Sequence, residues 1–203
     1  MNHTSEIRLL ISDFDGTLVD TEQANFLAYR KALSEAGIRL TPEIYADCFG
    51  LRAEEFLCRL GIVAPQEIIR IKKWKAAYYP SYFPELRLNE TLFTFLKACR
   101  GSGKRVAIAT TSRRENLFNV LNYFDIAGEF DYFVTGEDIQ KGKPDPECYL
   151  KVMSHFAIPP AQSLIFEDSS FGIQAARDSG ANYIVVDRSF YGNQGEWPFR
   201  LHD

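Results

Sequence analysis

The amino-acid sequence predicts an α/β protein built on a doubly wound parallel sheet. Five short apolar runs, rich in β-branched or aromatic residues, occur along the chain, and helical patterns separate most of them. Runs of this kind fit strands that are buried on both faces, as the strands of a parallel sheet are. A long helical stretch near the N-terminus interrupts the alternation, so we also expect a helical segment inserted into the sheet domain.

The expected strands are the apolar runs themselves, which lie at residues 9–11, 106–109, 132–134, 164–166 and 183–186. Apolar residues at helical spacing predict the helices of the sheet domain at residues 90–100, 114–123, 145–156 and 170–179. Gly180 is a typical stop signal for the last of these helices. The tail at 189–203 has no hydrophobic period, and we expect it to be irregular coil.

The inserted segment contains no good strand, and its expected helices lie at residues 22–36, 42–49, 53–60 and 65–79. The turns between these helices are marked by glycine residues, at Gly37, Gly50 and Gly61. We therefore predict two domains. Residues 1–19 and 87–203 form the sheet core, and residues 20–86 form the helical insertion.

Composition and charge exclude some classes of function. The chain has 203 residues, with 23 Lys and Arg against 27 Asp and Glu, and this mildly acidic balance speaks against a nucleic-acid-binding protein. No apolar run approaches the ~18 residues of a membrane span, and the first residues do not resemble a signal peptide. We expect a cytoplasmic protein that is a monomer or weak dimer and does not contact a membrane.

Two carboxylates follow the first expected strand. Asp13 and Asp15 are two residues apart, so their side chains leave an extended chain on the same side unless the backbone turns at Gly16. Carboxylates this close repel each other unless a cation lies between them, and an all-oxygen site suits Mg²⁺. The alternative is that these residues only form an acidic turn.

Polar residues also follow the second strand and precede a later helix. The hydroxyls and amides of Thr110, Thr111 and Ser112 are suited to hold phosphate oxygens, although Ser112 would serve equally well as a helix N-cap. Lys143 lies in a proline-rich loop, where it would neutralise a phosphate or a carboxylate, unless it is an ordinary solvated lysine.

A second acidic pair, Glu167 and Asp168, follows the strand expected at 164–166. These residues fit a metal site, and the alternative is that the segment only caps the next helix. Because the carboxyl ends of parallel strands meet at one edge of a sheet, we expect this pair to converge with Asp13, Thr110 and Lys143.

Taken together, these residues resemble the motifs of the haloacid-dehalogenase superfamily. Residues 13–21, Asp-Phe-Asp-Gly-Thr-Leu-Val-Asp-Thr, are similar to its first motif, and Thr110, Lys143 and the pair Glu167-Asp168 match the other three. The sequence Glu-Asp-Ser followed by Gly-Ile-Gln-Ala-Ala at 172–176 is similar to the β-phosphoglucomutase and phosphoglycolate phosphatase group. The resemblance implies a Rossmann-like core with a helical cap inserted after the first motif.

The resemblance also implies a Mg²⁺-dependent phosphohydrolase that cleaves a small phosphorylated metabolite, a phosphate monoester, through an aspartyl-phosphate. Asp13 would be the nucleophile, and Asp15 the general acid and base. Thr110, the amide of Thr111 and Lys143 would hold the phosphoryl group. Mg²⁺ would bind Asp13, the backbone carbonyl of Asp15, Asp168 and, through water, Glu167. A cis peptide bond is expected at Lys143-Pro144.

Other activities have weaker support in the sequence. A phosphomutase similar to β-phosphoglucomutase needs a cap histidine, and the matching position is Asn25. A phosphonate hydrolase needs a cap lysine, but we expect the lysines at 72–75 to form a solvated helix face. A binding module without activity is disfavoured by the intact motif residues. Arg52 would recognise an acidic group of the substrate, or else be an ordinary solvated arginine.

Overall fold

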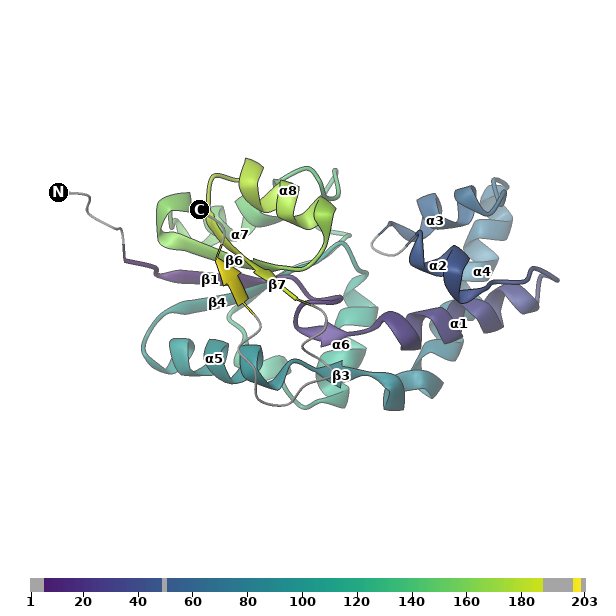
Figure 1. The fold of residues 1–203 in the computed structure, drawn as a ribbon, viewed down its shortest axis with the longest axis horizontal. Coiled ribbons are helices and arrows are strands. Elements are labelled where there is room, and N and C mark those ends of the chain that lie inside the picture. Colours follow the sequence, from purple (N-terminus) through teal and green to yellow (C-terminus); the bar gives the residue numbers. More distant parts are fainter. Residues whose placement is uncertain (1–5, 49–50, 188–198, 202–203) are drawn as a thin grey trace. The chain divides into compact units, whose positions relative to one another are not determined.

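A computed structural model of the chain describes residues 6–48, 51–187 and 199–201 (Figure 1). The chain divides into two compact units. The core unit comprises Met1–Asp20 and Arg87–Asp203, and the helical unit comprises Thr21–Leu86. None of the helices in the described part of the chain is both long and apolar enough to cross a membrane.

The core unit is organised around one sheet. Its strand order is β5 (Tyr132–Val134), β4 (Arg105–Ala109), β1 (Leu9–Ser12), β6 (Ser163–Glu167), β7 (Asn182–Val186) and β8 (Phe199–Leu201). The first five strands in this order run parallel to one another, and Ile11 of β1 is in register with Ala107 and Ile165. The predicted α/β fold with a parallel sheet is therefore confirmed, and all five predicted strands are present.

One part of the C-terminal tail differs from the prediction. We expected irregular coil at 189–203, but Phe199–Leu201 forms β8 and pairs antiparallel with β7. Without this pairing, β7 would present an unpaired edge of backbone N–H and C=O groups. A strand of three residues is too short to produce a recognisable alternation in the sequence. Residues 189–198 and 202–203 lie outside the described part of the chain.

Helices cover both faces of the sheet, as Figure 1 shows. α7 (Glu147–Phe156) and α8 (Ser170–Asp178) lie on one face, and α5 (Glu90–Gly101) and α6 (Arg114–Tyr123) lie on the other. Two short 3₁₀ helices, η2 (Ala127–Glu129) and η3 (Pro160–Gln162), precede β5 and β6. The helix expected at 145–156 starts later, because the backbone N–H of Glu147 donates to the side chain of Asp145, at 3.0 Å.

The central strands are buried on both faces, and this burial explains their continuous apolar runs. Leu9 and Ile11 of β1 pack with Tyr149 and Val152 of α7 in one core cluster. The intervening residue Leu10 is also buried, although its side chain leaves the strand on the opposite face. Polar residues therefore begin where the strands end, at the carboxyl edge of the sheet.

The helical unit contains α1 (Glu22–Ser34), α2 (Pro42–Ala46), α3 (Ala53–Arg59), α4 (Pro65–Tyr78) and the 3₁₀ helix η1 (Tyr79–Glu85). Its own core includes Phe26, Leu33, Phe56 and Ile71, and the rings of Tyr29 and Phe56 meet edge to face with centroids 4.8 Å apart. The helices occur where the sequence predicted them, with ends up to three residues shorter. Residues 49–50, which we expected at the end of one helix and in the following turn, lie outside the described chain.

The expectation of a solvated lysine face on α4 is wrong for Lys75. Its side chain is buried, and its ammonium lies 3.7 Å from the ring centroid of Tyr79 and 5.4 Å from that of Tyr29. Lys75 lies four residues after Ile71 and four before Tyr79, so the three side chains share one face of the helix. This face is buried. Its charge is stabilised there by the faces of aromatic rings.

A short antiparallel ribbon lies where the chain passes between the two units. β2 (Val19–Asp20) pairs with β3 (Arg87–Leu88), and the sequence did not predict either strand. Asn89 fixes the ribbon to the core, because its backbone N–H donates to the carbonyl of Leu18 at 2.9 Å and its side-chain amide donates to the carbonyl of Thr17 at 3.2 Å. The oxygen of the same side chain caps α5 by accepting the N–H of Leu92.

Candidate active site

The backbone of the sheet carries two of the predicted site residues into position. Just beyond β1, the N–H of Asp13 donates to the carbonyl of Phe166 at 2.9 Å, and just beyond β4 the N–H of Thr110 donates to the carbonyl of Val134 at 2.9 Å. These bonds continue the parallel ladders past the strand ends. The two side chains are therefore held by the sheet and not by a mobile loop.

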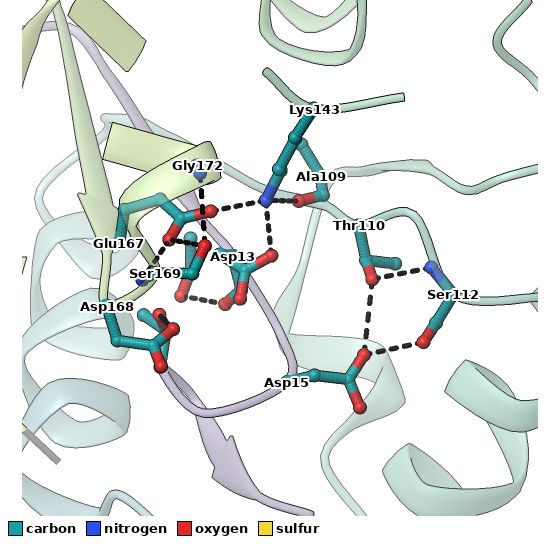
Figure 2. Close-up of polar contacts among 12 residues, drawn as sticks. Asp13, Asp15, Ala109, Thr110, Ser112, Lys143, Glu167, Asp168, Ser169 and Gly172 are labelled. Carbon is teal, nitrogen blue, oxygen red and sulfur yellow. Dashed lines mark hydrogen bonds and ion pairs between the residues drawn. The ribbon is translucent and has the colours of Figure 1, made fainter. Parts of the chain in front are cut away.

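Lys143 joins two of the carboxylates (Figure 2). Its ammonium nitrogen lies 2.5 Å from Oδ1 of Asp13 and 2.6 Å from Oε1 of Glu167, and it also donates to the carbonyl of Ala109 at 3.4 Å. All three charged side chains are less than a tenth exposed. The peptide bond between Lys143 and Pro144 is cis, which confirms that prediction.

Glu167 is held on all sides. Besides Lys143, its Oε1 accepts the hydroxyl of Tyr149 at 3.0 Å, and its Oε2 accepts the N–H and the hydroxyl of Ser169 at 2.9 and 3.1 Å. The same serine hydroxyl accepts the N–H of Gly172 and so caps α8. With four donors on its two oxygens, the buried carboxyl group of Glu167 has its hydrogen-bonding capacity satisfied, and it fixes the ammonium of Lys143 in space.

Burial and neighbouring charges set the protonation of this group. Burial raises the pKa of the Asp13 carboxyl well above its usual value, and Lys143 opposes this effect while Glu167 and Asp168 add to it. Burial also disfavours the charged form of Lys143, but the carboxylates of Asp13 and Glu167 prevail and raise its pKa well above the usual range. When ionised, three carboxylates and one ammonium leave two uncompensated negative charges, which a divalent cation would neutralise.

Gly172 allows α8 to approach Glu167. A Cβ atom at this position would lie 1.6 Å from Oε1 of Glu167, so we expect Gly172→Ala to displace the carboxylate and with it Lys143. The expected result is a loss of about 1–3 kcal/mol in the free energy of unfolding, together with a loss of activity. Denaturant titration measures the first effect. Gly101→Ala is the matched control, because nothing lies within 4 Å of its added Cβ, and equal effects of the two variants would contradict this prediction.

The turn after β1 brings the first motif against Asp168. Gly16 adopts a positive φ of 93°, and a Cβ at this position would lie 2.3 Å from Oδ2 of Asp168. The next residue, Thr17, donates its hydroxyl to Oδ1 of Asp168 at 2.8 Å. A side chain at position 16 would therefore be both strained and obstructed.

The turn also separates Asp15 from Asp13, as Figure 2 shows. Oδ2 of Asp15 accepts the hydroxyl of Ser112 at 2.6 Å and lies 3.4 Å from the hydroxyl of Thr110. Ser112 does not cap α6. The N-cap residue of this helix is Arg113, and its side chain makes no capping hydrogen bond. The alternative interpretation of Ser112 as an N-cap is wrong, because the serine lies two residues before the first residue of α6 and its hydroxyl donates to Asp15.

Three of the carboxylates form a donor set that fits a hard divalent cation. Asp13, Glu167 and Asp168 each offer one oxygen, and these oxygens lie within 4.8 Å of one another. Carboxylate oxygens are the ligands that Mg²⁺ prefers, usually one or two of them together with water and phosphate. Because both oxygens of Glu167 already accept hydrogen bonds, Asp13 and Asp168 are the better placed for direct contact.

Two further predicted site residues are Thr111 and Arg52. Thr111 lies between Thr110 and Ser112, with its carbonyl packed against Gly136. Arg52 belongs to the helical unit, where it is the N-cap residue of α3. Sequence reasoning missed Tyr149, because its place on the apolar side of a helix gives no sign that its hydroxyl reaches Glu167.

Comparisons with known proteins agree with this geometry. The sequence profile of the haloacid dehalogenase-like hydrolase family matches residues 10–186. The chain is 30% identical over 178 residues to a phosphorylated carbohydrates phosphatase of Thermotoga maritima, covering 86% of this chain and 82% of the relative. It is 25% identical over 188 residues to a phosphoglycolate phosphatase of Aquifex aeolicus, covering 89% and 84%.

A solved structure supports the fold. The β-phosphoglucomutase of Clostridium difficile superimposes with a TM-score of 0.78 at 23% identity, covering 90% of this chain and 86% of that one. The predicted resemblance to the β-phosphoglucomutase and phosphoglycolate phosphatase group is confirmed, and the protein is a hydrolase with phosphatases among its relatives. The chain belongs to the haloacid dehalogenase-like hydrolase family.

Proposed function

We propose that this protein is a Mg²⁺-dependent phosphatase that hydrolyses a small phosphate monoester through a phosphorylated Asp13. The observation that carries the proposal is the position of Asp13 at the end of β1, buried, 2.5 Å from Lys143, and grouped with Asp168 in one set of oxygen donors. A nucleophilic carboxylate, a fixed ammonium and a cation site in one place are what phosphoryl transfer requires.

The reaction runs in two displacements at phosphorus. The carboxylate of Asp13 attacks, a bond from its oxygen to phosphorus forms, and the bond from phosphorus to the alcohol oxygen breaks. Asp15 gives its proton to the departing oxygen. Water then attacks the same phosphorus, Asp15 accepts a proton from it, and the bond to Asp13 breaks. Inorganic phosphate leaves, and both aspartates return to their starting states.

The other site residues bind and orient the phosphoryl group. Lys143, the hydroxyl of Thr110 and the backbone amide of Thr111 are proposed to hold its oxygens, and the network around Glu167 keeps Lys143 in place. Asp13, Asp168 and the carbonyl of Asp15 would hold Mg²⁺, with Glu167 acting through water. When bound, the cation offsets the negative charge of the carboxylates and of the phosphoryl group.

The choice of substrate is assigned to the helical unit. We propose that residues 20–86 act as a cap domain to the core formed by 1–19 and 87–203, and that Arg52 recognises an acidic group of the substrate. The Nη2 atom of Arg52 is buried and forms no hydrogen bond with the described residues, and a buried donor of this kind calls for an anionic partner. The names of the Thermotoga and Aquifex relatives, a phosphorylated carbohydrates phosphatase and a phosphoglycolate phosphatase, support small phosphorylated metabolites as substrates.

A panel of phosphate esters tests this function. Sugar phosphates, phosphoglycolate, nucleotides and pyrophosphate are incubated with the protein, and released phosphate is measured with Mg²⁺, with EDTA, and with Mg²⁺ restored after EDTA. We expect turnover of at least one small monoester that EDTA abolishes and Mg²⁺ restores. A folded protein that releases no phosphate from any ester would overturn the proposal, as would turnover that EDTA leaves unchanged.

A further inference from the structure

Ser112 is placed to act on Asp15. Its hydroxyl donates to Oδ2 of Asp15 at 2.6 Å, within the range of a well-formed O–H···O hydrogen bond. The hydroxyl of Thr110 lies 3.4 Å from the same oxygen. Figure 2 shows the three side chains on one side of the site, away from Lys143.

The position of Ser112 is set by its backbone. Its N–H donates to the hydroxyl of Thr110 at 2.9 Å, and its carbonyl accepts the N–H of Gly136 at 2.8 Å. Gly136 itself permits this close approach, since a Cβ there would lie 2.4 Å from the carbonyl oxygen of Thr111. The loop after β4 is thus fixed to the loop after β5, and the serine hydroxyl is held at a defined point.

We propose that Ser112 is a positioning residue that orients the carboxyl group of Asp15 for proton transfer to the leaving group. This role rests on the proposed phosphatase function. A general acid is effective only when its reactive oxygen is aimed at the departing atom, and one fixed hydrogen bond to a carboxyl oxygen restricts rotation about the last torsion of the side chain. A hydroxyl is suited to the task in both states of Asp15, because it donates to the carboxylate and can accept from the acid.

The test compares two phosphate esters that differ in whether the leaving group needs a proton from a general acid. p-Nitrophenyl phosphate releases a phenolate that leaves without a proton, whereas p-nitrobenzyl phosphate has nearly the same shape and releases an alkoxide that needs one. The parameter to compare is kcat/KM, because it covers the steps up to departure of the alcohol and excludes the later attack of water. Ser154→Ala, an exposed serine on α7, is the matched control.

We expect Ser112→Ala to lower kcat/KM about 10-fold or more for the benzyl ester and markedly less for the phenyl ester, with Ser112→Thr restoring most of the loss. In an Asp15→Ala background, adding Ser112→Ala should change kcat/KM for the benzyl ester by less than about 2-fold, because the residue acts through Asp15. Ser154→Ala should match the wild type on both esters.

Each contrary outcome has a distinct meaning. Equal losses on both esters, or a full loss that persists in the Asp15→Ala background, would show that Ser112 contacts the substrate directly, and the positioning role would be wrong. Wild-type protein that hydrolyses neither ester, despite normal folding, would count against the phosphatase function and against this role together.

Discussion

Asp13→Asn is expected to reduce phosphate release by at least about 10⁴-fold, because the amide cannot supply the attacking oxygen. The substitution keeps the size and shape of the side chain, and Lys143 retains Glu167 as a charged partner at 2.6 Å. We therefore expect the thermal unfolding of the variant to stay close to that of the wild type. The measurements are steady-state phosphate release and thermal unfolding in the presence of Mg²⁺.

A trapping experiment distinguishes nucleophilic catalysis from a role of Asp13 in metal binding alone. Wild-type protein that is quenched in acid during turnover of a phosphate-labelled ester should carry the label, and the Asp13→Asn variant should not. Asp125→Asn is the matched control, because Asp125 is exposed and its positive φ of 55° suits asparagine equally well. The mechanism would be contradicted if the Asp13→Asn variant carried the label, or if it released phosphate at the wild-type rate.

Lys143→Met is expected to lower both activity and stability. The substitution leaves Asp13 and Glu167 as buried carboxylates without their shared cation, and removing one partner from a buried pair costs about 3–5 kcal/mol. A group that stabilises transition-state charge contributes about 10²–10³ to the rate, so kcat should fall by at least that factor. Denaturant titration and phosphate release measure the two effects.

The destabilisation of this variant should depend on divalent cations. Mg²⁺ would compensate part of the unpaired charge, so the difference in unfolding free energy from the wild type should be smaller with Mg²⁺ than with EDTA. Lys141→Met is the matched control, since its side chain is 75% exposed and lies 3.7 Å from Asp145. If both lysine variants lose similar stability, or if Mg²⁺ leaves the Lys143→Met deficit unchanged, the buried network around Asp13 is not what stabilises the site.

Much of the fold followed from where the apolar runs stop. A strand buried on both faces is mostly apolar, so Asp13, Thr110 and Glu167 stand out as polar residues within two positions of the end of such a run, and parallel pairing then brings them to one edge. The order of apolar and polar residues therefore predicts which residues lie at the site, but it does not predict which hydrogen bonds they make.

The features that the sequence did not predict depend on where a side chain points and on whether it is buried. A serine just before a helix can serve as a cap or make another contact, and only the hydrogen bond of its hydroxyl shows that Ser112 contacts Asp15. A lysine in a charged run is usually solvated, and only the ring faces of Tyr29 and Tyr79 explain the burial of Lys75. In both cases a contacting residue is distant in the sequence, Asp15 for Ser112 and Tyr29 for Lys75.

The ribbon of β2 and β3 has a consequence for the architecture of the chain. The points where residues 21–86 leave and rejoin the core are hydrogen-bonded neighbours, Asp20 beside Arg87 and Val19 beside Leu88. In topological terms, the whole helical unit occupies the place of a hairpin loop. Because these ends already meet, we expect that a two-residue turn in place of residues 21–86 would close the same gap without moving Asp13 or Asn89.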